Sequence, residues 1–226
     1  MVNNDWYLRQ VDIFEGLDKS QFESLFIPKT YVKKDVIYSP DDISDKIYYV
    51  KKGKVKLSKF SPDGKEIILG IYQTGEVFGE MVIYHSGQRE SFAMAIEESE
   101  IWMLRKSHLE KLISQIPELA ERLMTIIAQR RYEVEQRLED VVFRTVDERL
   151  ASLILVLAKK FGENIGKATR INLRLIHYDL ANLIGSTRET TTAVLNQFKR
   201  KKLIAIQDKM IIILDEKGLE ELIGKE

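Results

Sequence analysis

The 226-residue sequence predicts an α+β protein with an N-terminal antiparallel β domain, a long helix and a C-terminal winged helix-turn-helix. Three patterns lead to this expectation. Short β-type runs separated by turn residues fill residues 31–105. A helical period then covers residues 117–144. Finally, two helical runs flank Gly185, and two apolar runs follow them.

The β-type runs are regularly spaced. We read residues 1–30 as short helices, with Phe22, Leu25 and Phe26 on one stripe. Turn signals rich in Pro, Gly and Asp separate the runs that follow, and short strands at this spacing predict a barrel or sandwich. The runs are residues 34–38, 46–50, 54–60, 66–72 and 91–96.

The long helix carries a narrow apolar seam whose members alternate at three- and four-residue spacing: Met124, Ile127, Arg131, Val134, Leu138 and Val141. A seam of this kind usually pairs with a second helix, so we favour a parallel homodimer. The alternative is packing on the chain's own β domain. Leu123 and Ile126 widen the stripe, so the first part of the helix could serve both purposes. Arg131 would be a polar residue within this apolar seam, and such a residue can set the register between two paired helices.

The last third predicts a winged helix. Val146–Phe161 has a helical pattern, and residues 169–173 form a short extended piece. Around Gly185, the following hydroxyl residues suit a tight turn and a helix N-cap. Two apolar runs then surround a three-residue turn at 207–209, which indicates a hairpin. A helix-turn-helix followed by a hairpin can place its second helix in a DNA major groove.

Charge supports a local DNA-binding surface. The formal net charge of the chain is zero, so binding to DNA requires a basic patch. From Arg170 to Lys202 there are seven basic and two acidic residues, a balance of +5. The alternative is a solvated helix end, where Lys and Arg are also favoured. Because the cluster adjoins the turn motif, we interpret it as attraction for DNA.

Composition argues against several other classes. With no cysteine, disulfide scaffolds and thiolate-held metals or iron–sulfur clusters are ruled out. The three histidines (85, 108 and 177) are scattered, and neither a Walker-type loop nor a Gly-x-Ser-x-Gly motif occurs, so we expect no enzyme and no metal site. The sequence shows no signal peptide and no membrane-spanning run, which predicts a cytoplasmic protein.

The order of these segments resembles the cyclic-AMP receptor protein/FNR family of transcription regulators (the Crp/Fnr superfamily) over nearly the whole chain. Four stretches carry the likeness: residues 14–18, 75–80, the start of the long helix, and residues 184–190. The resemblance implies a cyclic-nucleotide-binding-like β-roll (a double-stranded β-helix) as an effector-type domain at 1–116. It further implies a dimerisation helix at 117–144 and a DNA-binding domain at 145–226. The implied function is regulation of transcription by a homodimer on a palindromic site.

Within the 184–190 signature, Arg188 and Glu189 match the two positions that touch bases in the family. Arg can donate to guanine and Glu can accept from cytosine. Thr192, one turn further on, could bond a base or touch a thymine methyl group. For Glu189 the alternative is a capping box with Ser186, three residues earlier. Ala193 stands where the cyclic-AMP receptor protein has another reading arginine, so we expect a different half-site.

Residues around the turn would then make the contacts to the DNA phosphates. The family often places a Thr-Arg pair at the start of the first helix, where this chain has Ile176 and His177. We therefore expect Ser186, Thr187 and His177 to contact the DNA backbone. Lys199, at the end of the second helix, would add salt-dependent attraction.

The effector site departs from the cyclic-nucleotide pattern. Gly79 and Glu80 match the ribose-binding pair of the family, and Ser91 follows in the same segment, residues 79–91, which we call the phosphate cassette. Counting from Gly79, however, Glu90 occupies the position of the phosphate-binding arginine, and Arg89 comes one residue early. A one-residue shift on a strand turns a side chain to the opposite face. We therefore expect that the protein does not bind cyclic AMP, unless the local register lets Arg89 take the place of the phosphate-binding arginine.

The sequence does not decide which other signal, if any, controls the protein. In the long helix, Val134 and Glu135 replace the hydroxyl residues that hold adenine, and Arg130 with Val134 could line the pocket. A haem ligand at His85 is one alternative, and a regulator that needs no effector is another. We expect no obligatory cofactor. RNA polymerase would be a partner if the protein activates transcription, which the sequence leaves undecided.

Overall fold

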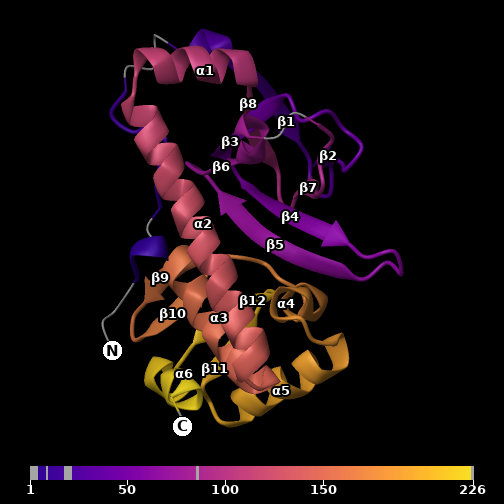
Figure 1. Cartoon of the computed structure of the whole chain (residues 1–226). Coiled ribbons are helices and arrows are strands. Elements are labelled where there is room, and N and C mark those ends of the chain that lie inside the picture. Colours follow the sequence, from indigo (N-terminus) through magenta and orange to yellow (C-terminus); the bar gives the residue numbers. More distant parts are fainter. Residues whose placement is uncertain (1–4, 9, 18–21, 85–86, 225–226) are drawn as a thin grey trace. The chain divides into compact units, whose positions relative to one another are not determined.

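The computed structural model describes residues 5–8, 10–17, 22–84 and 87–224 (Figure 1). The chain divides into two compact units, one formed by residues 10–128 and the other by residues 1–9 and 129–226. The division falls inside the long helix α2 (Glu118–Phe143), which contributes to both units.

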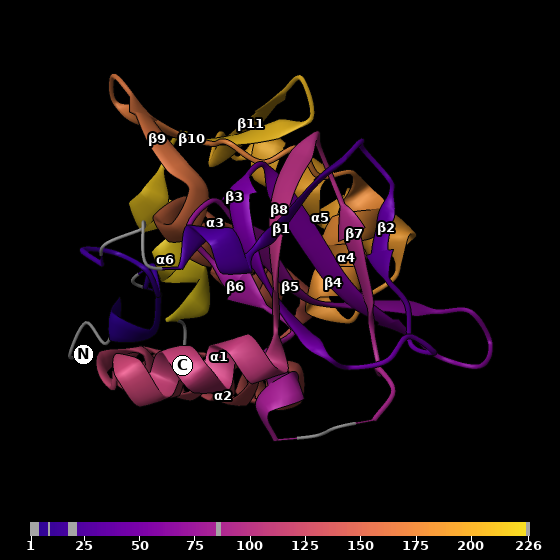
Figure 2. The same cartoon turned by 90° about the horizontal axis from the view of Figure 1, so that it is seen from above.

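The first unit is a β-roll of two four-stranded antiparallel sheets, with strand orders β1-β8-β3-β6 and β2-β7-β4-β5. In Figures 1 and 2, β4 and β5 form a long hairpin whose turn extends past the neighbouring strands of the roll. The strands are β1 (Ile27–Tyr31), β2 (Val36–Tyr38), β3 (Lys46–Lys52), β4 (Lys54–Phe60), β5 (Glu66–Gln73), β6 (Val77–Phe78), β7 (Phe92–Ala95) and β8 (Ser99–Arg105). The antiparallel β domain of the sequence analysis is confirmed.

The helical structure expected up to residue 30 is wrong for its last residues. The stretch read as helical before residue 30 ends in strand β1, which pairs with β8 from Ile27 to Tyr31. β1 is an edge strand, so Pro28 is tolerated there despite its missing N–H. Only a short 3-10 turn, Glu23–Leu25, precedes it directly.

Two apolar clusters stabilise the roll. Aromatic side chains fill the interior between the sheets, where Phe78 stacks with both Tyr48 and Tyr72. The other cluster joins Phe14 and its neighbours to the helices α1 (Lys106–Gln115) and α2. The α2 residues involved are Leu119, Leu123 and Ile126, so the first part of the long helix packs on its own roll.

The second unit contains the helix-turn-helix. Its helices are α3 (Val146–Phe161), α4 (His177–Ile184), α5 (Arg188–Arg200) and α6 (Glu216–Ile223). Its antiparallel sheet has the order β11-β12-β10-β9, with β9 (Gly162–Ile165), β10 (Ala168–Ile171), β11 (Ile204–Gln207) and β12 (Met210–Ile213). The winged helix-turn-helix is thus confirmed. Neither β9 nor α6 has a counterpart in the sequence analysis.

The β11–β12 hairpin is the wing of the winged helix, and its turn is one residue shorter than predicted. Gln207 pairs with Met210, which leaves Asp208 and Lys209 as a two-residue turn. Both have positive φ, 51° and 64°. Such turns match the right-handed twist of the paired strands, which explains why two residues suffice.

Candidate nucleic-acid interface and effector site

The turn between α4 and α5 depends on Gly185. Its backbone is left-handed, with φ 63° and ψ 46°, a conformation that glycine adopts without steric cost. The N–H of Ser186 donates to the carbonyl of Ala181 at 3.0 Å, and Nη1 of Arg149 donates to the carbonyl of Ile184 at 2.9 Å. The end of α4 is therefore tied to α3 as well as to the turn.

Helix α5 begins one residue later than a cap at Ser186 would require. Its N-cap is Thr187, whose Oγ1 accepts from the N–H of Thr190 at 3.1 Å. Glu189 is then the second helical residue, so the capping-box interpretation of Glu189 is wrong. Its carboxylate and the guanidinium of Arg188 are both exposed on the first turn.

The exposed face of α5 continues beyond this pair. Thr190, Ala193 and Asn196 are exposed along it, and Lys199 is exposed in the last turn. Asn196 was not among the predicted residues. Its position seven residues after Glu189, two helical turns, is the signal that could have identified it.

A groove lies where α4, α5 and the wing meet. Its volume is about 390 Å³. Three side chains that can carry positive charge contribute to it, His177, Arg188 and Lys209, and no acidic residue does. The remaining lining residues are Leu175, Ile176, Tyr178, Leu180, Ile206 and Ile211.

The basic cluster is less concentrated than the sequence suggests. Arg170 lies on β10 and pairs with Glu163 on β9 at 2.7 Å. The run from Lys199 to Lys202, by contrast, is exposed at the end of α5. The structure thus assigns Arg170 to the sheet and leaves the helix end as the exposed cationic segment.

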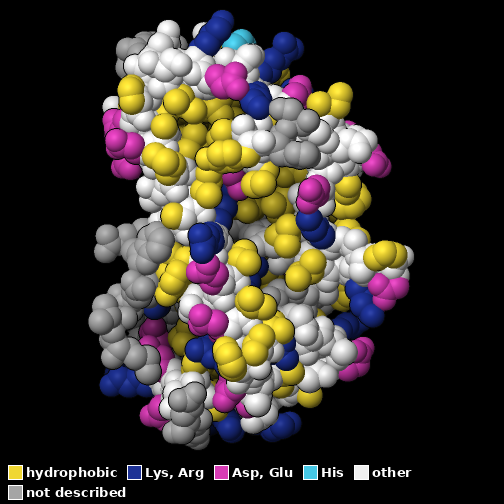
Figure 3. All heavy atoms as spheres, in the orientation of Figure 1, with side chains coloured by type: hydrophobic (Ala, Val, Ile, Leu, Met, Phe, Trp, Pro, Cys, Tyr) yellow, Lys and Arg dark blue, Asp and Glu magenta, His cyan; other side chains and the backbone are white. Residues whose placement is uncertain are grey.

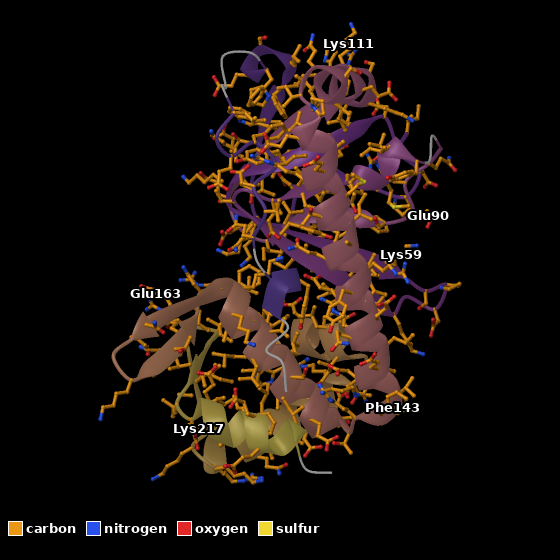
Figure 4. The ribbon with its side chains drawn as sticks, turned by 60° about the vertical axis from the view of Figure 1, so that its left-hand side comes forward. Lys59, Glu90, Lys111, Phe143, Glu163 and Lys217 are labelled. Carbon is orange, nitrogen blue, oxygen red and sulfur yellow. The ribbon has the colours of Figure 1, made fainter. Side chains whose placement is uncertain are left out.

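The predicted seam of α2 presents apolar side chains to the surface. Val134, Leu138 and Val141 are each more than half exposed, with Val134 at 62%. Met124 is also exposed, and Ile127 is half-buried. Arg131 pairs along the helix with Glu135 at 2.8 Å. Hydrophobic side chains are visible over α2 in Figure 3, and Phe143 at its end is 79% exposed (Figure 4).

Inside the roll, Arg89 is buried, with 6% of its surface exposed. Its Nη1 donates to the carbonyl of Gly79 at 3.1 Å, and its Nη2 donates to the carbonyl of Lys46. The guanidinium carbon lies 4.6 Å from the ring centre of Tyr38 and 5.2 Å from that of Tyr48. The guanidinium approaches Gly79 closely, because a Cβ at that position would lie 2.8 Å from Nη1 and one of the two would have to shift.

The directions expected for Arg89 and Glu90 from a strand register are therefore wrong, and the alternative of a local register that turns Arg89 inward holds. Arg89 points into the roll, whereas Glu90 points outward and pairs with Lys59 at 2.9 Å (Figure 4). The strand rule fails because these residues precede β7. Arg89 N donates to the carbonyl of Asp42, and Ser44 N to that of Gly87, so backbone bonds to another segment set their directions.

The electrostatics of this interior follow from burial. Burial raises the pKa of the Tyr38 hydroxyl, and the charge of Arg89 and a hydrogen bond with Ser91 partly oppose the rise. Burial also raises the pKa of Tyr48, again opposed by Arg89. Gly79, Glu80, Arg89 and Ser91 all belong to the roll, whereas Arg130 and Val134 belong to the other compact unit.

Two further results concern ligands and membranes. Within the described residues, no group of three or more His, Asp or Glu side chains could hold a metal ion. His85, the haem candidate, lies outside the described residues. None of the described helices combines the length and apolar character that crossing a bilayer requires.

Comparison with known families assigns both halves of the chain. A model described as "Cyclic nucleotide-binding domain" matches residues 28–116. A second, described as "Crp-like helix-turn-helix domain", matches residues 148–222.

Similar proteins cover nearly the full length. The chain is 30% identical over 218 residues to a CRP-like cAMP-activated global transcriptional regulator of Mycobacterium tuberculosis, covering 95% of this chain and 97% of that protein. It is 29% identical to a global nitrogen regulator of Nostoc, covering 83% and 85% respectively. Among solved structures, a CooA mutant from Carboxydothermus hydrogenoformans shares the fold with a TM-score of 0.81 at 20% identity, covering 96% of this chain and 99% of that one.

Proposed function

The chain belongs to the Crp/Fnr family of transcription regulators, and we propose that it acts as a homodimer on an imperfectly palindromic DNA site. The observation that carries this proposal is the pair Arg188 and Glu189, both exposed on the first turn of the capped helix α5. Family members are regulators rather than enzymes, so we set the enzyme alternative aside.

Base recognition would start at this first turn. Arg188 can donate two bonds to guanine and Glu189 can accept one from cytosine, so the pair suits a G·C-containing half-site. Backbone contacts would come from Ser186 and Thr187 at the turn. Lys199 would add attraction to phosphate at the other end of the helix.

The exposed seam of α2 supports a dimer. Burying a Val or Leu side chain contributes about 1.5–3 kcal/mol, so exposed residues repeating along one helix face favour pairing with a second copy. Two recognition helices would then reach successive major grooves, about 34 Å apart.

For the input we propose a small effector other than cyclic AMP. Glu90 points outward and pairs with Lys59, so its carboxylate does not face a ligand in the roll. Arg89 supports this proposal, because two of its nitrogens already bond carbonyls of the roll itself. A regulator that needs no effector remains an alternative that this arrangement also suits.

A second candidate is a cyclic-nucleotide-dependent regulator. One observation favours it: Nε of Arg89 is buried without a hydrogen-bond partner, inside the roll. An anion could bond there, because a phosphate suits a guanidinium. If the protein activates transcription, RNA polymerase would be a further partner.

Selection from random DNA sequences tests the output. The purified full-length protein should enrich inverted half-sites centred about 10 base pairs apart. Enrichment of single half-sites would contradict the dimeric mode, and no enrichment would contradict sequence-specific binding.

Calorimetry tests the input. Titration with cyclic AMP should release no measurable heat in the wild-type protein. Micromolar binding that is lost in Arg89→Met would establish the second candidate instead.

A further inference from the structure

The hydroxyl group of Thr192 has two hydrogen-bond partners. Its Oγ1 lies 2.7 Å from the carbonyl oxygen of Arg188, one turn earlier on α5. It also lies 2.8 Å from Nδ1 of His177, the first residue of α4. A carbonyl oxygen can only accept, so the single hydroxyl proton goes to Arg188. Nδ1 of His177 must therefore donate to Thr192.

This assignment fixes the chemistry of both side chains. The neutral His177 ring carries its proton on Nδ1, which leaves Nε2 as an acceptor. Thr192 has no second proton to donate. Its hydroxyl can still accept one bond, and its methyl group can make apolar contacts.

The bond also connects two elements. His177 and Thr192 are half-buried and lie fifteen residues apart in the chain, one on each helix of the helix-turn-helix. The bond to the Arg188 carbonyl restricts χ1 of Thr192 to the few rotamers that allow it. Arg188 and His177 line the same groove, so the bond lies beside the proposed reading surface.

We infer that His177 is a positioning residue for base recognition. It holds Thr192 through Nδ1, and so acts on the DNA through Thr192 rather than by its own phosphate contact. This inference rests on the proposed DNA binding. Thr192 then accepts from adenine N6 or cytosine N4, or touches a thymine methyl group, and cannot donate to guanine.

The tautomer can be tested without DNA. Long-range proton–nitrogen NMR of the full chain should show Nδ1 of neutral His177 bearing the proton, and Thr192→Val should remove this preference. A proton on Nε2 in the wild-type protein would overturn the inference. Because this measurement involves no DNA, it stands whether or not the proposed function holds.

Paired substitutions test the effect on recognition. The amide nitrogen of Asn can take the place of Nδ1, whereas that of Gln reaches the place of Nε2. His177→Asn should keep the wild-type sequence preference. His177→Gln and Thr192→Val should each change relative affinity at the same base pair by about fivefold or more. The double variant should show no larger change, because both substitutions remove one interaction.

Thr125→Val is the matched control. Thr125 makes the same bond to a carbonyl one turn earlier, Glu121 O at 2.9 Å, on α2. The Thr125→Val substitution should leave the base preference unchanged. Rescue by Gln instead of Asn would show that Nε2 acts directly and would overturn the inference. If the wild-type protein selects no DNA sequence, the proposed function fails, while the NMR result still decides the His177–Thr192 bond.

Discussion

Arg89 and Glu90 are consecutive residues whose side chains lie on opposite sides of the roll wall. The guanidinium of Arg89 is inside, against the rings of Tyr38 and Tyr48, and the carboxylate of Glu90 is outside, 2.9 Å from Lys59 Nζ. The buried group bonds backbone carbonyls, and the exposed one bonds a surface lysine. Their contributions to stability should therefore differ greatly.

Arg89→Ala should lower the free energy of unfolding by about 2–4 kcal/mol, because it removes the hydrogen bonds to the carbonyls of Gly79 and Lys46 and opens a cavity. Glu90→Ala is the matched control. It removes an exposed ion pair, since 74% of the Glu90 side chain is accessible, and should cost less than about 1 kcal/mol. Urea denaturation measures both, and equal losses would contradict the buried role of Arg89.

Arg188→Ala should weaken the binding free energy by about 1–3 kcal/mol at one base pair of the site and relax the preference for that base. The reason is that a bidentate contact to guanine discriminates strongly against other bases. Fluorescence anisotropy with a selected site and its single-base variants measures the change. Lys217→Ala on α6 serves as the control, and unchanged discrimination by Arg188→Ala would refute the assignment.

Lys199→Ala should behave differently. It should weaken binding to all sequences alike and lower the slope of log affinity against log salt by about 1, because one phosphate contact is lost. Titrations at several salt concentrations give this slope. A change confined to one base pair would instead indicate base contact.

Val134→Asp should weaken the dimer, because it places a charge in the apolar seam. Sedimentation at several protein concentrations measures the association. Val32→Asp makes the same substitution at a similarly exposed valine of the roll and should leave association unchanged. A dimer unaffected by Val134→Asp would mean that another surface pairs the chains.

Alkaline pH should destabilise the roll through Tyr38. Burial raises the pKa of this hydroxyl above its ordinary value of 10.0. The unfolded chain therefore loses this proton first as the pH rises. The stability contribution of the protonated hydroxyl is complete below pH 10.0 and is lost as the pH climbs towards the folded pKa.

Tyr38→Phe should accordingly reduce the loss of stability above pH 10.0, as measured by denaturation at a series of pH values. Tyr84→Phe, at a tyrosine that is 70% exposed, is the control. If both variants lose stability with pH as the wild type does, Tyr38 does not contribute to the alkaline transition.

The order of segments could be predicted from sequence because periodicity and turn residues are local properties. The heptad spacing of α2, the αL glycine at 185 and the apolar runs of the wing each depend on neighbouring residues. The same holds for the exposure of Arg188 and Glu189, which follows from helical spacing. The wing turn is one residue shorter than predicted, and the sequence left open which of the two hydroxyl residues, Ser186 or Thr187, caps α5, since hydrogen bonding sets these boundaries.

The side-chain chemistry of the two candidate sites depended on contacts between distant segments. Arg89 turns inward because residues 42–46 and Gly79 supply its partners, and no count along the cassette contains that information. Thr192 gives its proton to the nearby Arg188 carbonyl, but it accepts from Nδ1 of His177 only because the fold brings His177 next to it across the turn. In both cases the direction of a polar group follows from the partner that satisfies it, and folding alone brings that partner close.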